Sequence, residues 1–321
     1  MADAKTGAVT PNRFSWHRGE VELQRHAGVA ELMAGLGPRV IRDYLPEQHR
    51  TFFQQLPSIV VGVADEFGNA WATVLCGVPG FVRTDPHSLH IGALAYPGDP
   101  AASGLRAGSA IGLLGIDLSN RRRNRANGII RALGSSSFDV DVVESFGNCP
   151  QYIHTRVPAF IRSPLEPPAA PPEEATIADP RVRDLIGHAE TLFIASYFDD
   201  GQDRRVDVSH KGGQQGFVKI DEAGHLLIPD YAGNRFFNTL GNILLTPQCG
   251  LVFVDFANGD VLQITGEGTV ILDAAQLAGF EGAERLLRVD VKRLVFRPAA
   301  LPLRWTSSEN GSLPSSGASG T

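Results

Sequence analysis

Cysteine is scarce in this chain, and no C-x-x-C pair occurs. The three cysteines, Cys76, Cys149 and Cys249, are odd in number and far apart. Such a set cannot form a disulfide framework or a zinc knuckle, so we expect free thiols that pack as small apolar side chains. The nine histidines show no H-x-x-x-H or H-x-x-E-H spacing, and no metal site is therefore predicted.

A strong excess of one charge and a long apolar run are also missing. The net charge is only -6 over 321 residues, which gives no basic surplus for nucleic acid or an anionic membrane. No run approaches the roughly 20 apolar residues that span a bilayer. The first fifteen residues lack the apolar core of a signal peptide. We expect a cytoplasmic protein that binds neither membrane nor nucleic acid.

One basic run interrupts this even distribution. Residues 121–125 read "RRRNR" and are interpreted as a turn with solvated side chains. Binding of nucleic acid or of a phosphate-bearing substrate is the alternative interpretation of this run.

The chain is predicted to divide near its middle. Residues 163–176 are rich in proline and acidic residues, which is typical of an extended connector. They separate an N-terminal half, residues 1–162, from a C-terminal half, residues 177–305. Residues 306–321 are rich in serine and glycine without periodicity and are predicted to be a disordered tail.

Short sequences recur in the two halves. "GLLGID" at residues 112–117 aligns with "GLVFVD" at residues 250–255, and the same spacing relates Gly128 to Gly266. Two further matches, a "GFV" sequence and a turn glycine, lie at Gly80 and Gly216 and at Gly68 and Gly201. We interpret these matches as an internal duplication, with chance similarity of short apolar sequences as the alternative.

The C-terminal half reads as short strands separated by Gly, Asn and Asp turns. The predicted strands span residues 191–198, 205–211, 216–220, 225–230, 250–256 and 261–271. Six closely spaced strands favour an antiparallel barrel. We therefore expect a mainly β protein with flanking helices, built from two small barrels.

Helices are predicted at three places around these barrels. One begins with Asp179 as its cap and Pro180 at its first position. Residues 234–245, "NRFFNTLGNILL", carry apolar residues at helical spacing. In the first half, residues 20–36 are predicted to form one helix. Its expected buried stripe is Val29, Leu32, Met33 and Leu36.

Residues 204–218, "RRVDVSHKGGQQGFV", concentrate cationic and hydroxyl side chains before a glycine pair. Alternate residues of a strand share one face. Here they are Arg205, Asp207, Ser209 and Lys211. Such donors suit a phosphate, because charge-assisted hydrogen bonds are about twice as strong as neutral ones. A solvated strand face with an Asp–Arg ion pair is the alternative.

A second segment, residues 229–238, reads "PDYAGNRFFN" and leads into a predicted helix. Its polar side chains are Tyr231, Asn234, Arg235 and Asn238. Unpaired N–H groups and the positive end of the helix dipole favour an anion at such a place. Simple capping of the helix by asparagine, with an exposed arginine, is the alternative.

The two segments together resemble the pyridoxamine 5′-phosphate oxidase-related family of FMN-binding split barrels. In that family an R-x-V-x-x-K strand and a Y-x-x-S-R-K-x-x-Q helix entry hold the phosphate and ribityl chain of FMN. In this sequence the basic residue falls one place late, at Lys211, and the Ser-Arg-Lys triplet is reduced to Gly-Asn-Arg. "NCPQYI" at residues 148–153 also resembles an N-C-P-x-Y-I signature of relatives. The positions that the resemblance assigns to FMN are Arg205, Val206, Asp207, Val208, Ser209, His210, Lys211, Tyr231, Asn234, Arg235, Asn238 and Gln263.

The resemblance implies tandem antiparallel split barrels of the FMN-binding type, with the flavin ring in a cleft between them. It implies an FMN-dependent oxidoreductase that acts on a small-molecule substrate or accepts electrons from a donor, and a possible homodimer. No catalytic residue is assigned. A non-catalytic carrier or sensor of flavin or haem is the alternative.

Overall fold

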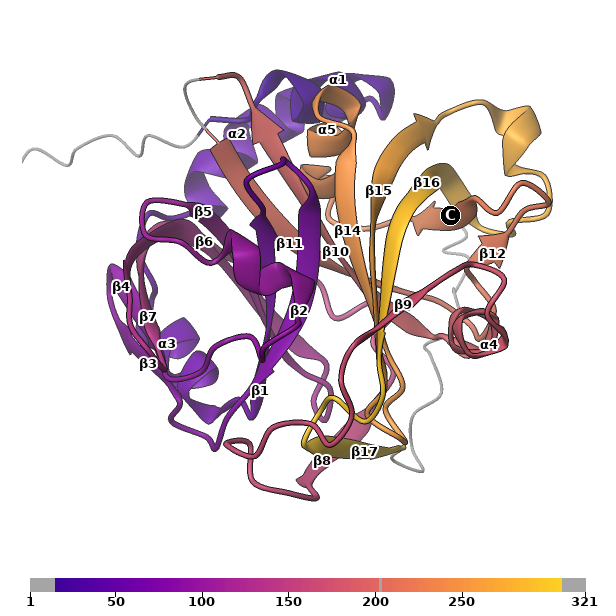
Figure 1. The fold of residues 1–321 in the computed structure, drawn as a ribbon. Coiled ribbons are helices and arrows are strands. Elements are labelled where there is room, and N and C mark those ends of the chain that lie inside the picture. The colour runs from indigo at the N-terminus through magenta and orange to yellow at the C-terminus, as the bar shows by residue number, and fades with distance from the viewer. Residues whose placement is uncertain (1–14, 202–203, 308–321) are drawn as a thin grey trace, which may run out of the picture.

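The computed structural model describes residues 15–201 and 204–307, and it is mainly β with flanking helices (Figure 1). The N-terminal half contributes α1 (Arg18–His26), α2 (Ala30–Val40), α3 (Glu47–Gln55), β1 (Ser58–Ala64), β2 (Ala70–Cys76), β3 (Val82–Asp85), β4 (Ser88–Ile91), the 3₁₀ turn η1 (Pro100–Gly104), β5 (Ala110–Asp117), β6 (Arg122–Leu133), β7 (Phe138–Gly147) and β8 (Arg156–Phe160). The rest of the chain contributes β9 (Glu173–Ala175), α4 (Pro180–His188), β10 (Thr191–Asp199), β11 (Arg204–Gly212), β12 (Lys219–Ile220), β13 (Leu226–Tyr231), α5 (Asn238–Leu245), β14 (Gln248–Val254), β15 (Val261–Ile271), the 3₁₀ turn η2 (Ala274–Leu277), β16 (Ala283–Arg297) and β17 (Leu303–Ser307).

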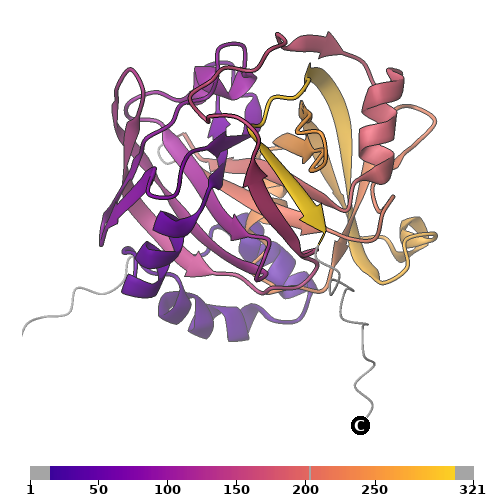
Figure 2. The same ribbon diagram turned by 90° about the horizontal axis from the view of Figure 1, so that it is seen from below.

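Two antiparallel sheets form the body of the molecule. The first has the strand order β2-β1-β5-β6-β7-β4-β3, and the second has the order β11-β10-β14-β15-β16-β13-β12, with β9 added to β16. The two orders are identical when strands are matched by their place in each half. A separate ribbon of β8 and β17 pairs the end of the first half with the end of the second (Figure 2). The topology therefore repeats, as the sequence matches predict.

Two repeated glycines occupy equivalent bulges. Gly128 in β6 and Gly266 in β15 both follow a shift of register in their sheet. A Cβ atom at either position would lie 2.1 or 2.3 Å from the backbone oxygen of Asp141 or Asp290. Glycine is required at both bulges because any side chain would collide with the neighbouring strand.

The other pair of repeated glycines, Gly112 and Gly250, lies where the backbones of the two halves touch. A Cβ atom at Gly112 in β5 would lie 2.9 Å from the Cα of Asp207 in β11, and one at Gly250 in β14 would lie 2.4 Å from the backbone oxygen of Ala70 in β2. β5 of the first half therefore packs against β11 of the second half. Its counterpart β14 packs in the same way against β2, which is the counterpart of β11.

Among the described residues, buried apolar side chains form three large clusters and two smaller ones. One core lies within each half, and a third lies between the halves, where Val60 and Leu114 of the first sheet pack with Phe193, Val208 and Val252 of the second. The buried contact between the halves is thus continuous with the interior of the molecule, and the indigo-to-magenta and orange-to-yellow halves of Figure 1 lie against each other.

The helix starting after Asp179 is confirmed, because the side chain of Asp179 accepts a hydrogen bond from the backbone N–H of Arg181 and Pro180 opens α4. The single helix expected over residues 20–36 is wrong. It is broken into α1 and α2 at Gly28, whose φ is +70°. Leu32 is 64% exposed, so the expected apolar stripe is also wrong at that residue.

The structure also differs from the sequence predictions in where some helices and strands begin and end. Residues 234–237 are not helical, because Arg235 and Phe237 adopt left-handed backbone conformations, and α5 begins at Asn238. Thr306 and Ser307 belong to β17 and not to a tail, while residues 308–321 lie outside the described residues. The long strand β16 is absent from the sequence prediction, although it pairs with β15, β13 and β9.

The cysteines and the helices bear on two expectations from composition. Cys76, Cys149 and Cys249 are free thiols. Among residues 15–201 and 204–307, no helix has the length and apolar character to cross a membrane.

We expect cleavage of the chain between residues 167 and 172 to leave the two halves associated. The segment between Glu166 and β9 lies outside the sheets, whereas the contact between the halves is a buried apolar core. After limited proteolysis, two fragments on a denaturing gel should elute as one species in native size-exclusion chromatography. Fragments that separate without denaturant would contradict the shared core.

Candidate functional site

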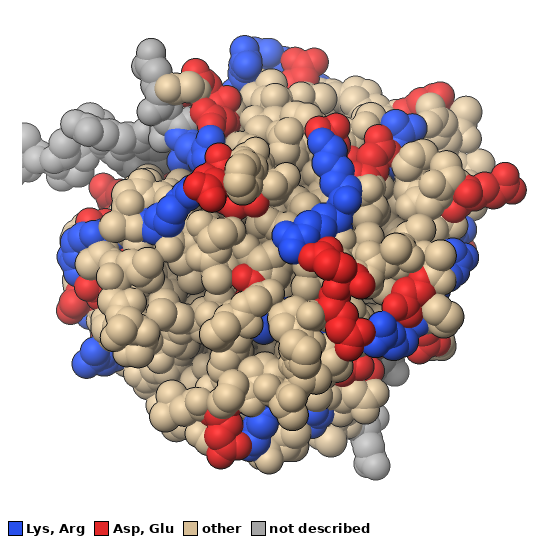
Figure 3. Space-filling view, viewed as in Figure 1, with Lys and Arg blue, Asp and Glu red and all other residues tan. Residues whose placement is uncertain are grey.

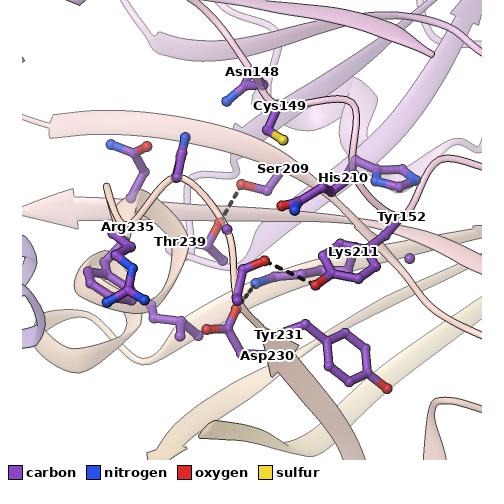
Figure 4. A pocket seen from close by; sticks show the side chains of 18 of the residues that line it. Asn148, Cys149, Tyr152, Ser209, His210, Lys211, Asp230, Tyr231, Arg235 and Thr239 are labelled. Atoms are coloured by element: carbon purple, nitrogen blue, oxygen red, sulfur yellow. Dashed lines mark hydrogen bonds and ion pairs between the residues drawn. The ribbon is translucent and has the colours of Figure 1, made fainter. Parts of the chain in front are cut away.

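A cleft lies where the start of α5 and the ends of β11 and β13 meet β6 and the segment after β7 (Figure 4). Both halves of the chain therefore contribute to it. Its volume is about 110 Å³. The side chains that line it include Arg123, Arg125, Asn148, Cys149, Tyr152, Ser209, His210, Lys211, Asp230, Tyr231, Asn234, Arg235, Asn238, Thr239 and Arg285.

Positive charge exceeds negative charge at this cleft. The cationic side chains in its lining are Arg123, Arg125, Lys211, Arg235 and Arg285. Asp230 is the carboxylate in the lining, and two more carboxylates, Asp207 and Glu284, contact the cations from its edge. Five cations against three carboxylates leave a net positive charge, which favours an anionic ligand.

Asp230 holds two of these cations. It forms an ion pair with Lys211 (Figure 4). It also accepts a hydrogen bond from the Nε of Arg285 at 2.9 Å. The positive charges of Lys211 and Arg285 keep the pKa of Asp230 below its ordinary value, against the effect of burial. The carboxylate is therefore ionised and fixes both cations at the floor of the cleft.

Arg123 makes its described hydrogen bonds to uncharged groups. It donates to the backbone oxygen of Cys149 at 2.8 Å and to the Nδ1 atom of His210 at 3.0 Å. Burial, followed by the charge of Arg123, lowers the pKa of His210 well below its usual value. His210 is therefore neutral, with Nδ1 as an acceptor, and it does not offset or add to the charge of Arg123.

Arg125 connects the first half to the polar face of β11. It donates to Asp207 and Asn238, at 3.0 Å each, and also to Ser209. The hydroxyl of Ser209 in turn forms a hydrogen bond with the hydroxyl of Thr239, with 2.5 Å between the two oxygens. Figure 4 marks this contact with a dashed line. This chain of contacts fixes the start of α5 against β11 and β6.

Two buried polar atoms at the cleft have no hydrogen-bond partner among the described residues. They are the Nε of Arg125 and the Oδ1 of Asn148. Unpartnered buried polar atoms are costly and rare in folded proteins. A donor and an acceptor left open at one cleft are consistent with a polar ligand there.

The backbone at the cleft is strained. Tyr152, Arg235 and Phe237 have φ values of 62°, 60° and 62°, in the left-handed region that non-glycine residues seldom adopt. All three line the cleft. Strained residues of this kind gather at binding and catalytic sites, where the surrounding structure holds them.

The structure brings most of the predicted positions together. Ser209, His210, Lys211, Tyr231, Asn234, Arg235 and Asn238 all line the cleft. Asp207 contacts Arg125 at the edge of the cleft. The other predicted positions lie elsewhere: Arg205, Val206, Val208 and Gln263. Val206 and Val208 are buried in apolar clusters, and Arg205 contacts the backbone oxygen of Ser15 and Glu144 outside the cleft.

The interpretation of residues 121–125 as a solvated turn is right only at the start of the run, where Arg121 lies in a turn and Arg122 is exposed. Residues 122–125 begin β6, and Arg125 is only 7% exposed. Alternation along a strand places Arg123 and Arg125 on the same side, toward the second half, while Arg122 lies over the ring of Phe52. The spacing of two residues between Arg123 and Arg125 is the feature of the sequence that places them on one face of a strand.

The carboxyl group of Glu20 on α1 holds Asn238 from behind the cleft. It accepts hydrogen bonds from the side chain of Asn238 at 2.6 Å and from the backbone N–H of His17 at 2.9 Å. Burial raises the pKa of Glu20 to about 8, so the group is protonated at neutral pH. α1 thus approaches the start of α5 without adding a negative charge to the cleft.

Comparison with known proteins gives partial likenesses only. No family model matches the chain, and no curated protein matches it. Solved structures that resemble part of it include a pyridoxinephosphate oxidase-family protein from Clostridium acetobutylicum related to general stress protein 26 of B. subtilis (10% identity, TM-score 0.27, 40% of this chain and 92% of that chain), an FMN-binding protein from Syntrophomonas wolfei (9%, 0.26, 36% and 82%) and the haem storage protein HutZ from Vibrio cholerae (14%, 0.27, 37% and 94%).

We expect replacement of the buried acid, Glu20→Gln, to change how stability depends on pH. The raised pKa means that Glu20 contributes fully below about pH 4.5 and that this contribution is lost as the pH rises through about 8. The neutral amide avoids this loss. The variant should gain on the order of 2–4 kcal/mol relative to wild type between about pH 5 and about pH 9, measured by urea unfolding. A difference that stays constant with pH would show that Glu20 titrates normally.

Proposed function

We propose that the protein is a flavoprotein that binds FMN, with the phosphate in the cleft between the two halves. The observation that carries this proposal is the surplus of positive charge in the cleft lining, above all Arg123, whose described hydrogen bonds go to uncharged groups. A phosphate monoester carries up to two negative charges and several acceptor oxygens, which match this set of donors.

The architecture that we propose is a pair of tandem split barrels within one chain. The identical strand order of the two sheets and the reciprocal contacts of Gly112 and Gly250 support it. In this arrangement one chain supplies both walls of the cleft. A homodimer would then be a further level of assembly and not a requirement for the site.

The size of the cleft limits how the ligand can lie. At about 110 Å³ it is smaller than the roughly 300–1,000 Å³ typical of complete ligand pockets. We infer that it holds the charged end of FMN, while the ring extends past Tyr152 and Tyr231, whose rings lie 5.3 Å apart at the side of the cleft. Lys211 and Arg285 are held in place by Asp230, so they need no reorganisation when an anion arrives.

The activity that we propose is an oxidoreductase in the cytoplasm, acting on a small-molecule substrate or taking electrons from a donor. When bound, FMN supplies the transfer of a hydride or of electrons. The protein's residues would position the flavin and stabilise its phosphate. The part of the chain that the structure describes holds no cluster of three His, Cys, Asp or Glu side chains placed for a metal ion.

We expect Lys211→Ala to weaken FMN binding by about 10- to 150-fold, because it removes one charge-assisted contact worth roughly 1.5–3 kcal/mol. Asp230 keeps its bond to Arg285, so the fold should survive, which a thermal melt checks. Titration of the apo-protein, followed by flavin fluorescence, measures the affinity. Equal FMN affinity in the variant and the wild type would mean that this strand does not hold the phosphate.

Two comparisons separate the contribution of the phosphate from the rest of the binding free energy of FMN. Riboflavin lacks it and should bind the wild type and Lys211→Ala about equally. Arg205→Ala is the matched control, since it removes a cation from the same strand outside the cleft, and it should leave FMN affinity within about twofold.

A reduction experiment separates the enzyme from the carrier. We expect the FMN-loaded protein to lose its yellow absorbance when NADH or NADPH is added without oxygen. A flavin that resists both donors, or a preparation with the Soret band of haem, would instead support a carrier or sensor. Recording spectra of the protein as purified and after anaerobic addition of each donor decides between them.

A further inference from the structure

A second cavity lies on the other side of the contact between the two halves. Its volume is about 810 Å³. It is lined by the end of β2, the segment that joins β4 to η1, and residues that follow β16. Its lining includes Val74, Leu75, Phe81, Leu94, Asp99 and Arg297.

This cavity is the counterpart of the charged cleft in the duplicated fold. In β5 and β6, Leu114 pairs with Arg125, and at the same place in β14 and β15, Val252 pairs with Gln263. β2 corresponds to β11, β4 to β13, and η1 to α5. Each cavity also takes residues from both halves: Arg123 and Arg125 of the first half line the charged cleft, and Arg297 and Leu301 of the second half line the second cavity.

A detail of the loops supports this correspondence. A Cβ atom at Gly77, just after β2, would lie 2.3 Å from the ring of Phe81, and one at Gly213, just after β11, would lie 2.7 Å from the ring of Phe217. The same turn, closed by the same phenylalanine, follows both strands. The two cavities thus share a backbone frame and differ in their side chains.

The side chains differ most in charge. Each of the five cations of the charged cleft has an uncharged residue at the equivalent position of the other half, and Leu75, Pro97 and Ser136 among these line the second cavity. Arg123 corresponds to Val261, Arg125 to Gln263, Lys211 to Leu75, Arg235 to the Pro97–Gly98 turn and Arg285 to Ser136. The groups that would hold a phosphate are therefore replaced throughout.

The charges that do line the second cavity are paired. Arg297 donates to Asp99 at 2.6 Å, and both residues are at most 5% exposed. Gln263 donates to Asp99 at 2.8 Å and accepts from Arg297 at 3.2 Å. His90 contacts Asp139 at 2.8 Å. Among the described residues, no cation of this lining lacks a carboxylate to balance it.

The remaining lining is mainly apolar. Val74, Leu75, Phe81, Leu94 and Leu301 face a volume within the range of complete small-molecule sites. Val78 and Leu165, also in the lining, are 62% and 87% exposed. Figure 3 shows that the lower part of this face of the molecule carries few charged side chains. A volume of this size with balanced charge favours an apolar occupant.

We propose that this second cavity binds an uncharged, mainly apolar small molecule that carries no phosphate. The backbone arrangement of the two cavities is the same, whereas their side chains differ in charge. One site recognises an anion and the other an uncharged molecule. This proposal does not depend on whether the charged cleft binds FMN.

Nile red, an uncharged flat dye whose fluorescence rises and shifts to the blue in apolar surroundings, is a suitable probe. We expect saturable binding to the full-length protein with one site per chain. Leu94→Glu places a charge in the cavity and should weaken binding at least tenfold, whereas Leu94→Met should leave it within about threefold. Absence of saturable binding, or equal affinity in Leu94→Glu and the wild type, would overturn the proposal.

Two further measurements distinguish this cavity from the charged cleft. Tyr231→Glu is the matched control, because Tyr231 lies at the corresponding place in the charged cleft, and it should leave Nile red affinity unchanged. Saturating FMN should not displace the dye, and displacement would show that the two cavities do not differ as proposed. If Leu94→Glu fails to fold, Ala95→Trp fills the same cavity without adding a charge and should also abolish dye binding.

Discussion

The close backbone contact between the two halves is the constraint on which the rest of the structure depends. Gly112 lies against β11 and Gly250 lies against β2, and both contacts leave no room for a side chain. Because the strands meet at backbone distance, β6 and β15 reach across to the other half. Arg125 thereby contacts Ser209, and Gln263 contacts the backbone of Ala72. Each cavity is built from both halves for this reason.

Once the frame is set, the chemistry of each cavity depends on a few side chains. In the charged cleft, cations outnumber carboxylates, and Asp230 holds two of them while remaining ionised. Burying such charges is costly unless they are paired, so a surplus is stable only with an anion or with solvent access. In the second cavity Asp99 and Arg297 neutralise each other, and no such surplus remains in the described lining.

The residues predicted from sequence to bind FMN do not all lie in the same cavity. Ser209, Lys211 and Asn238 line one cleft, because they lie on adjacent elements of the same half. The resemblance assigns Gln263 to the same cleft, yet Gln263 is fully buried on the other side and donates a hydrogen bond to Asp99 of the second cavity. Its counterpart Arg125 takes that place, and it comes from the first half. A residue that crosses from one repeat to the other cannot be placed by reading one repeat alone.

The order of residues along the chain was enough to predict the repetition of the fold and the start of α4, but not the break at Gly28 or the strand β16. Strand alternation, the cap at Asp179 and the repeated glycines are local features, because each depends on the conformation of a few neighbouring residues. Tertiary structure alone decided which side chains meet. Arg123 and His210 are far apart in the chain, and their contact depends on how two sheets pack. The same packing decides that one cavity is charged and the other is balanced, since burial and the distance between charges are properties of the folded molecule.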